Sequence, residues 1–429
     1  MRSFLDEISL RRVREPVSPR FGISQHLSEE FPVLFEKVDG YPIFRVAGNL
    51  CNSRDTFARI LRTTRARILS AFSEALDSPS DYGMVNSASF LKNRVRDPDL
   101  TEELPLCVYF GPEERYYSTA SIVLARDPET GRENASFHRM MHISGNRMVI
   151  RIVPRDLYSF FKKNQDHGDD TEIVIICGVH PAVSMAAATS YPNLNELRLA
   201  NTIMQGGLRC HSLAGIDVPS HTEVVMTGRI LHDEEVEEGP FVDLTGTWDA
   251  VRQQPVVEVD TLYHRDNPIW QVILPAGKEH RLLMGIPQEP RIFRIVQNAV
   301  PTVTNVTLPP AGLSWLHAVV SIKKRAEGEG GNAALAALSA HPSLKRVIVV
   351  DDDIDIFDPD MVEWAVATRL RPGKGITVIP DTRGSSLDPS SGKSGLVSKW
   401  FIDATIPLDA DPGKFMRVDA SHTPAEKES

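Results

Sequence analysis

Cysteine is scarce in this chain, and its placement argues against two structural classes. The 429 residues include four cysteines, and none of them forms a CxxC pair. Neither a disulfide framework nor a zinc ribbon is therefore expected. A widely spaced cysteine is usually a small buried residue, and we predict that role for all four. They are Cys51, Cys107, Cys177 and Cys210.

Long apolar runs are also absent. No stretch approaches the roughly 18 consecutive apolar residues that a membrane-spanning helix needs. Residues 1–17 carry charges throughout and lack the apolar segment of a secretory signal. The sequence therefore predicts a cytoplasmic protein that has no membrane partner.

Basic residues do not outnumber acidic ones. The chain has 47 Lys and Arg residues against 57 Asp and Glu residues, a formal net charge of -10. This balance disfavours a general nucleic-acid binder, which needs a basic face, but leaves room for a local basic pocket for an anionic substrate. The length exceeds what one compact core usually contains, so we predict two or three domains.

The N-terminal part, residues 1–103, mixes helical and extended patterns. Apolar residues recur at helical spacing over residues 56–76, and Asp55 stands where a helix cap is expected. Short apolar segments at residues 32–35 and 42–46 are typical of strands. We predict a small α/β domain here.

Residues 104–290 have a different texture. Segments rich in Val, Ile and Tyr recur, and turn-forming residues separate them. One helix is expected over residues 156–163, with Asp156 as its N-cap. So many strands joined by turns favour a β-barrel.

Strands and helices alternate again over residues 291–429, which predicts a small α/β layer. The polar tail from Ser421 onward is expected to be frayed. The expected strands are residues 292–300, 304–310 and 345–350, and the expected helices are residues 315–324, 332–339 and 359–368.

Asn134 and Arg139 form the first motif with possible chemistry. They follow a turn at Gly131, and a turn that leads into a strand presents alternate side chains to one side. The amide oxygen of Asn134 suits a hard cation such as Mg²⁺ or Mn²⁺, and the Arg139 guanidinium suits a carboxylate. Taken alone, the same residues also fit a turn Asn and a surface Arg.

Glu238 and Asp243 form the second motif, because Gly239-Pro240 makes a tight bend between them. Two carboxylates in unlike environments can differ in pKa, so that one is ionised while the other carries a proton. An arginine between them would hold both in place. The alternative is a charged surface loop, since several neighbouring residues are also acidic.

Two further motifs stay ambiguous. The acidic run Asp351–Asp355 can bind Mg²⁺ with a nucleotide-linked substrate, or it can cap a helix and solvate a turn. The segment Gly328–Gly331 loosely imitates a dinucleotide loop, but it lacks the full glycine pattern and follows no clear strand.

The order of these motifs along the chain resembles that of the UbiD-type decarboxylases, which use prenylated FMN. Four stretches carry the resemblance, from about residue 105 to about residue 405. They are Glu133-Asn134-Ala-Ser-Phe-His-Arg139; Gly178-Val-His-Pro-Ala182 with Ser184 and Met185; Glu238-Gly-Pro-Phe-Val-Asp243; and Val350–Asp355 followed by Trp364, Arg369, Lys399 and Ile402–Thr405.

The resemblance implies an α/β protein with a β-barrel. Its parts would be an N-terminal α/β domain over residues 1–103, a split β-barrel that binds the flavin over residues 104–290, and a C-terminal α/β oligomerisation domain over residues 291–429. The acidic run Asp351–Asp355 then becomes a structural feature. The implied partners are a second copy of the chain, in a dimer or higher oligomer, and a flavin prenyltransferase that supplies the cofactor.

The resemblance also implies catalytic roles. Loss of CO₂ leaves electron density on carbon, and the modified flavin ring supplies a sink for it. Arg139 would hold the substrate carboxylate, Asp243 would protonate the carbon after CO₂ leaves, and Glu238 would lie between the flavin and Arg139. The residues implied in cofactor binding are Asn134, Ser136, Phe137, His138, Arg139, Arg155, Ser184, Met185 and Lys399.

A metal ion, Mn²⁺ or Mg²⁺, would bridge the flavin phosphate, and K⁺ is a further candidate ion. Asn134 and Glu196 match the metal-binding positions of the family. The third position commonly holds His, whereas this chain has Asp156, which can still bind a hard cation. Val242 also departs from the family, which usually has Gly there.

The family acts on aromatic, heteroaromatic and α,β-unsaturated acids. This chain is short and resembles the archaeal branch that converts trans-anhydromevalonate 5-phosphate to isopentenyl phosphate. Such a substrate carries a phosphate, and Arg147, Arg151 and Arg155 are candidates for holding it. Two alternatives stay open: an aromatic acid such as a hydroxybenzoate-type quinone precursor, and a flavin-binding module without turnover.

Overall fold

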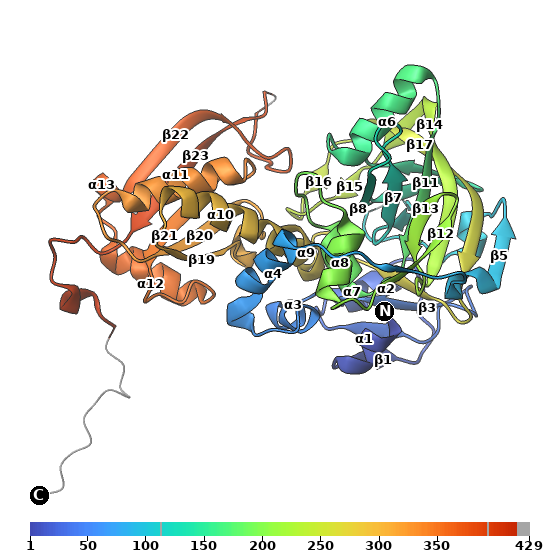
Figure 1. Ribbon diagram of the computed structural model, residues 1–429, viewed down its shortest axis with the longest axis horizontal. Helices are drawn as coiled ribbons and strands as arrows, with labels where there is room; N and C mark the ends of the chain where they lie inside the picture. The colour runs from blue at the N-terminus through green and yellow to red at the C-terminus, as the bar shows by residue number, and fades with distance from the viewer. Residues whose placement is uncertain (112–113, 393, 418–429) are drawn as a thin grey trace, which may run out of the picture. The chain divides into compact units, whose positions relative to one another are not determined.

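The structure is a computed structural model of the chain that describes residues 1–111, 114–392 and 394–417. It contains two compact units, Met1–Pro290 and Arg291–Ser429, and each is described here by itself (Figure 1). The polar tail that was expected from Ser421 lies outside the described residues.

A four-stranded sheet in the first unit joins the N-terminus to a segment far along the chain. Its order is β1-β2-β3-β18, and β3 pairs with β18 in parallel. The N-terminal segment and the later strands therefore belong to one compact unit, and the boundary at residue 103 stays a prediction. The strands are β1 (Arg11–Val13), β2 (Val33–Phe35), β3 (Arg45–Gly48) and β18 (Ile269–Val272), and the helices nearby are α1 (Arg2–Glu7) and α2 (Gly22–Leu27).

The helix expected over residues 56–76 is two helices, α3 (Arg54–Ile60) and α4 (Ile68–Asp77). Arg62 takes a positive φ of 51° between them, a conformation that an α-helix cannot continue through. Ser53, not Asp55, caps α3, because its hydroxyl accepts a hydrogen bond from the Thr56 N–H.

A nine-stranded antiparallel sheet dominates the first unit, with the order β6-β9-β10-β17-β14-β11-β7-β8 and β5 beside β17. The expectation of many strands joined by turns is therefore confirmed. Within the described residues the end strands β6 and β8 do not pair with each other, so no closed barrel is seen. The strands are β5 (Asn93–Arg96), β6 (Tyr117–Ser118), β7 (Ile122–Arg126), β8 (Glu133–Phe137), β9 (Met140–Ser144), β10 (Arg147–Ile150), β11 (Thr171–Cys177), β14 (Val224–Glu238) and β17 (Arg252–His264).

Shorter elements lie around this sheet. The expected helix at residues 156–163 is α6, but Arg155 is its N-cap and Asp156 stands in its first turn, so the predicted cap was wrong. The elements are α5 (Leu100–Glu103), α6 (Asp156–His167), α7 (Pro181–Ala187), α8 (Glu196–Ile203), α9 (Lys278–Gly285), β4 (Gly83–Met84), β12 (Arg209–Leu213), β13 (Ile216–Pro219), β15 (Phe241–Val242) and β16 (Trp248–Asp249).

The second unit is a five-stranded sheet of order β19-β20-β21-β23-β22 with a helix layer on each face. Ala333 and Ala337 of α11 pack on one face, and Val362 and Ala365 of α12 pack on the other. The elements are β19 (Val303–Thr307), β20 (His317–Ile322), β21 (Arg346–Asp351), β22 (Ile376–Arg383), β23 (Leu396–Ala404), α10 (Glu289–Ala299), α11 (Glu329–Ala340), α12 (Pro359–Arg369) and α13 (Pro372–Gly375).

Two sequence assignments in this unit were wrong. Residues 292–300 were expected to be a strand, but they belong mostly to α10, where Ile292 and Val296 are buried one turn apart. Residues 315–324 were expected to be a helix, but they contain β20. This strand is buried on both faces, so its apolar residues form a continuous run without the alternation of a half-exposed strand.

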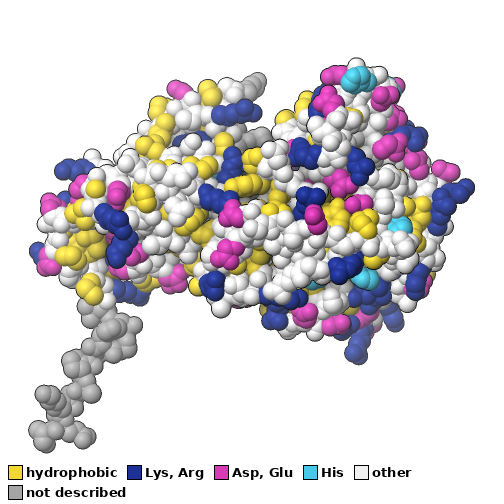
Figure 2. All heavy atoms as spheres, viewed as in Figure 1, with side chains coloured by type: hydrophobic (Ala, Val, Ile, Leu, Met, Phe, Trp, Pro, Cys, Tyr) yellow, Lys and Arg dark blue, Asp and Glu magenta, His cyan; other side chains and the backbone are white. Residues whose placement is uncertain are grey.

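The surface carries charged side chains of both signs, in agreement with the composition. On the face drawn in Figure 2, acidic and basic side chains lie beside one another. Among the described residues, no helix is long and apolar enough to cross a membrane. All four cysteines are buried and free, as predicted.

Candidate active site

Arg139 lies at the centre of a buried ionic cluster between β8 and β9. Its Nε and Nη2 donate to the two oxygens of Glu238 at 2.9 and 2.8 Å, and its Nη1 donates to Asp243 Oδ2 at 2.5 Å. The structure therefore brings together the three residues that were expected to carry the chemistry. The two-pronged contact with Glu238 fixes the plane of the guanidinium as well as its position.

Three residues that the sequence did not single out complete this cluster. Asp249 accepts a hydrogen bond from Arg139 Nη2 at 3.1 Å, and the Tyr117 hydroxyl donates to Glu238 Oε1 at 3.3 Å. The Phe241 ring lies 4.3 Å from the guanidinium carbon of Arg139, within cation–π range. Phe241 stood inside the recognised acidic motif, whereas no local pattern pointed to Tyr117 or Asp249.

Burial makes the charges of this cluster depend on one another. The side chain of Glu238 is 0% exposed and that of Arg139 is 9% exposed. Burial alone would lower the pKa of Arg139, but the hydrogen bonds and charge of Glu238, helped by Asp243 and Asp249, outweigh it and raise that pKa. Arg139 therefore stays charged, and removal of one partner would leave a buried charge without compensation.

The bend after β14 explains how Glu238 and Asp243 reach the same arginine. Gly239 has a φ of 103°, a left-handed conformation that favours glycine, and the hairpin β15–β16 follows. The Asp243 N–H donates to the Thr247 carbonyl at 3.1 Å, and Asp243 Oδ1 accepts from the Leu244 N–H at 2.6 Å. These contacts hold Asp243 in place while its Oδ2 faces Arg139.

His280, in the first turn of α9, lies within electrostatic range of Asp243. The Ala276 N–H donates to His280 Nδ1 at 3.1 Å, so the proton of the neutral ring lies on Nε2. Burial, together with the charges of Arg139 and Arg281, lowers the pKa of His280, and Asp243 opposes that shift. The sequence reasoning missed His280, because only the fold brings α9 beside the acidic motif.

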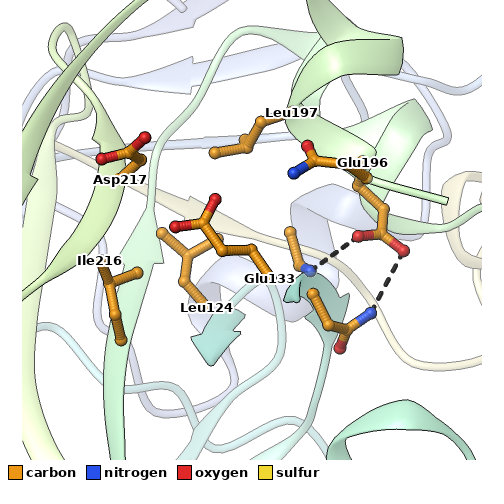
Figure 3. A pocket seen from close by; sticks show the side chains of 9 residues that line it. Leu124, Glu133, Glu196, Leu197, Ile216 and Asp217 are labelled. Atoms are coloured by element: carbon orange, nitrogen blue, oxygen red, sulfur yellow. Dashed lines mark hydrogen bonds between the residues drawn. The ribbon is translucent and has the colours of Figure 1, made fainter. Parts of the chain in front are cut away.

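Asn134 and Glu196 form a second buried group, and Figure 3 labels Glu196 with the two hydrogen bonds that its carboxylate accepts. Asn134 Nδ2 donates to Glu196 Oε1 at 3.2 Å, and the Ala135 N–H donates to Oε2 at 2.9 Å. Burial raises the pKa of Glu196 to about 8, so a cation beside this carboxyl would favour its ionised form. The cavity next to it measures about 10 Å³, roughly the space of one water molecule.

Asp156 does not join Asn134 and Glu196 by a hydrogen bond. Its Oδ1 pairs with Arg132 Nη2 at 2.5 Å, and its side chain is 40% exposed. Among the described residues, no group of three His, Cys, Asp or Glu side chains is arranged to hold a metal ion. Asn134 and Glu196 are therefore the two candidate metal-binding residues that lie together, with the amide nitrogen of Asn134 facing Glu196 and its oxygen accepting from Ser136 Oγ at 2.9 Å.

The remaining cofactor candidates lie in several places. Ser136 Oγ and His138 Nε2 are 3.0 Å apart, next to Asn134. The Ser184 hydroxyl on α7 is buried without a hydrogen-bond partner in the described chain, which fits a polar group arriving from outside the protein. Phe137 is half-buried on β8, Met185 is buried on α7, Arg155 is exposed before α6, and Lys399 lies in the second unit, where its Nζ donates to the Pro342 carbonyl at 2.6 Å.

A larger cavity of about 260 Å³ borders the Arg139 cluster. Tyr117 and Phe241, which contact Glu238 and Arg139, form part of its wall. The lining residues are Tyr109, Phe110, Gly111, Arg115, Tyr117, Pro240, Phe241, Val242 and Trp248.

The acidic run after β21 has a structural role. Arg369, whose side chain is 0% exposed, pairs with Asp351 at 2.8 Å and with Asp353 at 2.6 Å. Asp351 Oδ2 also accepts from the Ile406 N–H at 2.8 Å. The run therefore ties α12 and the segment that follows β23 to the end of β21.

Comparison with known proteins covers most of the chain. Residues 6–76, 84–278 and 281–404 match the N-terminal, Rift-related and C-terminal domains of the 3-octaprenyl-4-hydroxybenzoate carboxy-lyase family. The anhydromevalonate phosphate decarboxylase of Methanothermobacter thermautotrophicus is 43% identical, over 98% of this chain and 100% of that protein. The same-named protein of Methanocaldococcus jannaschii is 41% identical, over 91% of this chain and 92% of its own.

A solved structure is also similar. The UbiD-class enzyme HmfF from Pelotomaculum thermopropionicum, in complex with FMN, superposes with a TM-score of 0.95 at 36% identity, covering 97% of this chain and 96% of that one. Domain matches along the chain, relatives similar over full length and a shared mixed α/β fold agree with one another. The chain belongs to the UbiD family of carboxy-lyases.

Proposed function

We propose that this protein is a prenylated-FMN-dependent decarboxylase that converts trans-anhydromevalonate 5-phosphate to isopentenyl phosphate. The observation that carries the proposal is the buried fork of Arg139 between Glu238 and Asp243. The substrate is supported by 43% identity, over nearly the whole chain, to a protein named for that decarboxylation. A flavin-binding module without turnover would have no need of this arginine and both carboxylates.

Each member of the cluster has a part in the proposed reaction. Arg139 holds the substrate carboxylate by its charge and keeps the two acids in place. Glu238 fixes the plane of Arg139 by the two-pronged contact. After CO₂ has left, Asp243 donates a proton to the carbon that carried it, and a new C–H bond replaces the broken C–C bond.

The cofactor proposed for this reaction is prenylated FMN, which when bound supplies a conjugated ring that accepts electron density from the reacting carbon. The unpartnered, buried Ser184 hydroxyl supports a bound polar group near α7. A flavin prenyltransferase in the same cytoplasm is the proposed supplier. The residues proposed to hold the cofactor are Asn134, Ser136, Phe137, His138, Arg139, Arg155, Ser184, Met185 and Lys399.

Asn134 and Glu196 are the proposed ligands of Mn²⁺ or Mg²⁺, with K⁺ as a further ion. Their oxygens suit a hard cation. Asp156 stays the proposed third residue, although it would have to leave Arg132 to bind the metal directly. The ion would neutralise the flavin phosphate beside this carboxylate.

The finer architecture is also proposed. The nine-stranded sheet corresponds to the split barrel of the flavin domain, and the second unit corresponds to the oligomerisation domain. A second copy of the chain is the proposed partner of β22, an edge strand whose Ile376 and Val378 are 40% and 60% exposed (Figure 1). Unpaired edges with exposed apolar residues are ready sites for pairing between chains.

The function is tested with protein from cells that also make a flavin prenyltransferase. Its absorption spectrum and metal content are recorded, and CO₂ release is measured with anhydromevalonate phosphate and with hydroxybenzoates. Release from the phosphorylated acid alone is expected. Turnover of hydroxybenzoates alone would assign the aromatic alternative, and a colourless protein without CO₂ release would refute the enzyme.

A further inference from the structure

The 260 Å³ cavity has an uneven chemical lining. Its walls are mostly aromatic or apolar, and among the described lining residues Arg115 alone carries a full charge. None of the described lining residues is acidic. Such a cavity suits a ligand that has a short apolar body and one anionic end, because an anion is attracted only where the arginine stands.

Two residues that line the cavity, Phe241 and Tyr117, also contact the cluster around a second cation, Arg139. The Phe241 ring lies over the Arg139 guanidinium at 4.3 Å, and Tyr117 donates to Glu238, which holds Arg139. The charge of Arg115 also acts on Tyr117, and Arg115 Nη1 lies 3.6 Å from Met141 Sδ. Arg115 in the cavity lining and Arg139 next to Phe241 are therefore two cations that both act on Tyr117.

Two of the residues that line the cavity, Gly111 and Trp248, lie close together. A Cβ on Gly111 would lie 3.0 Å from the Trp248 ring, and the φ of Gly111 is 87°. A side chain at this position would therefore press on Trp248 and also strain the backbone. The chain at Gly111 therefore lies close to Trp248 of the β15–β16 hairpin, and both this approach and the positive φ favour glycine at residue 111.

We propose that Arg115 binds the terminal phosphate of the substrate in this cavity, while Arg139, which borders the cavity through Phe241 and Tyr117, receives its carboxylate. This assignment rests on the proposed function, since it requires an acid that also carries a phosphate monoester. Guanidinium is well suited to phosphate because its N–H groups form a planar fork. The aromatic walls would cover the short carbon chain between the two anions.

The arginines that the sequence suggested for the phosphate are placed differently. Arg147 pairs with Glu234, and Arg151 donates to the Ile152 carbonyl at 3.1 Å. Arg155 is exposed before α6. None of the three lines the described cavity, so strand position alone did not identify the residue that faces it.

The test compares two substrates: the phosphorylated acid, and the same acid with a free hydroxyl in place of the phosphate. Arg115→Gln is expected to lower kcat/KM for the phosphorylated acid by about 10- to 100-fold, the range for losing a charged hydrogen bond. The change for the hydroxyl acid is expected to stay within about 3-fold, and Arg115→Lys should recover part of the loss. An equal effect on both acids, or none, would overturn the proposal.

Two further variants control the comparison. Arg94→Gln removes an arginine that stacks on Tyr263 at 5.6 Å and does not line the described cavity. This variant is expected to leave kcat/KM unchanged for both acids. Arg147→Gln tests whether Arg147 binds the phosphate instead. A loss of kcat/KM for the phosphorylated acid alone in this variant, and not in Arg115→Gln, would refute the role of Arg115. Thermal melting of each variant separates misfolding from lost recognition.

The phosphate could instead belong to the cofactor, which also carries one. FMN titration followed by flavin fluorescence distinguishes the two, because unchanged FMN affinity in Arg115→Gln supports the substrate and weakened affinity overturns the proposal. If the wild-type protein turns over neither acid, the proposed function fails separately. Calorimetry then compares the binding of inorganic phosphate to the wild-type protein and to Arg115→Gln. Equal affinities would refute phosphate binding by Arg115.

Discussion

Arg139 has three carboxylates within hydrogen-bond distance, so its immediate surroundings carry more negative than positive charge. Such an arrangement is costly in a buried place unless good geometry and hydrogen bonds offset the desolvation of the charges. The acids differ in exposure, with Glu238 at 0% and Asp243 at 17%. The more open Asp243 is therefore better placed than Glu238 to exchange a proton with a substrate.

Asp243→Asn is expected to keep flavin binding and to lower kcat at least about 100-fold, because the amide cannot donate a carboxylic acid proton. CO₂ release and the flavin absorption spectrum measure the two effects. Asp249→Asn is the matched control, since it also contacts Arg139 and should lose less activity. Full activity in Asp243→Asn would mean that another group supplies the proton.

Helix α7 shows how a single cap can make an element sensitive to pH. His180 is its N-cap, and His180 Nδ1 accepts from the Ala182 N–H at 3.1 Å. Burial lowers the pKa of His180 to about 4, below the ordinary value of 6.5. The unfolded chain therefore binds this proton more readily than the folded one. The cap contributes fully above pH 6.5 and is lost as the pH falls towards 4.

We therefore expect His180→Asn to flatten the stability of the protein between pH 6.5 and about 4, because asparagine is a good cap that does not titrate. Between these pH values the change in the free energy of unfolding should differ between the two proteins by a few kcal/mol, at about 1.4 kcal/mol for each unit of pKa shift. Chemical denaturation at several pH values measures it. Parallel pH profiles for the two proteins would show that His180 does not control acid stability.

Other elements show why local patterns were insufficient. The apolar run of β20 was taken for a helix because both faces of that strand are buried. Residues 292–300 are mostly helical, and Ile292, Val296 and Val300 are buried in one core cluster with residues of the later strands and helices. In both places the burial that decides the structure comes from neighbours distant in sequence.

At the scale of the whole molecule, β22 is one of the two edge strands of the sheet in the second unit. Val378→Lys combined with Ile376→Lys is expected to reduce the mass of the assembly, since charged side chains disfavour pairing between edge strands. Size-exclusion chromatography with light scattering measures the mass. Leu335→Lys on α11, where the leucine is 48% exposed, is the matched control and should leave the mass unchanged. A wild-type protein that is monomeric would contradict the proposal.

The sequence by itself determined the family, the strand-rich middle of the chain and the identity of Arg139, Glu238 and Asp243. Motifs of this kind are local, since a bend such as Gly239-Pro240 can be read from adjacent residues. Their order along the chain then distinguished them from surface groups with the same composition. The position of Asn134 in the same chain order likewise suggested where a hard cation would bind.

Only the tertiary structure decided which distant residues join these motifs. Asp249 on β16 and Tyr117 on β6 contact the Arg139 cluster, and His280 on α9 interacts with it electrostatically. No spacing in the sequence records that approach. The same holds for Arg115, whose place in the aromatic cavity depends on two loops more than a hundred residues apart. The physical reason is that burial and long-range contact set both the charge and the surroundings of a side chain, and local sequence specifies neither.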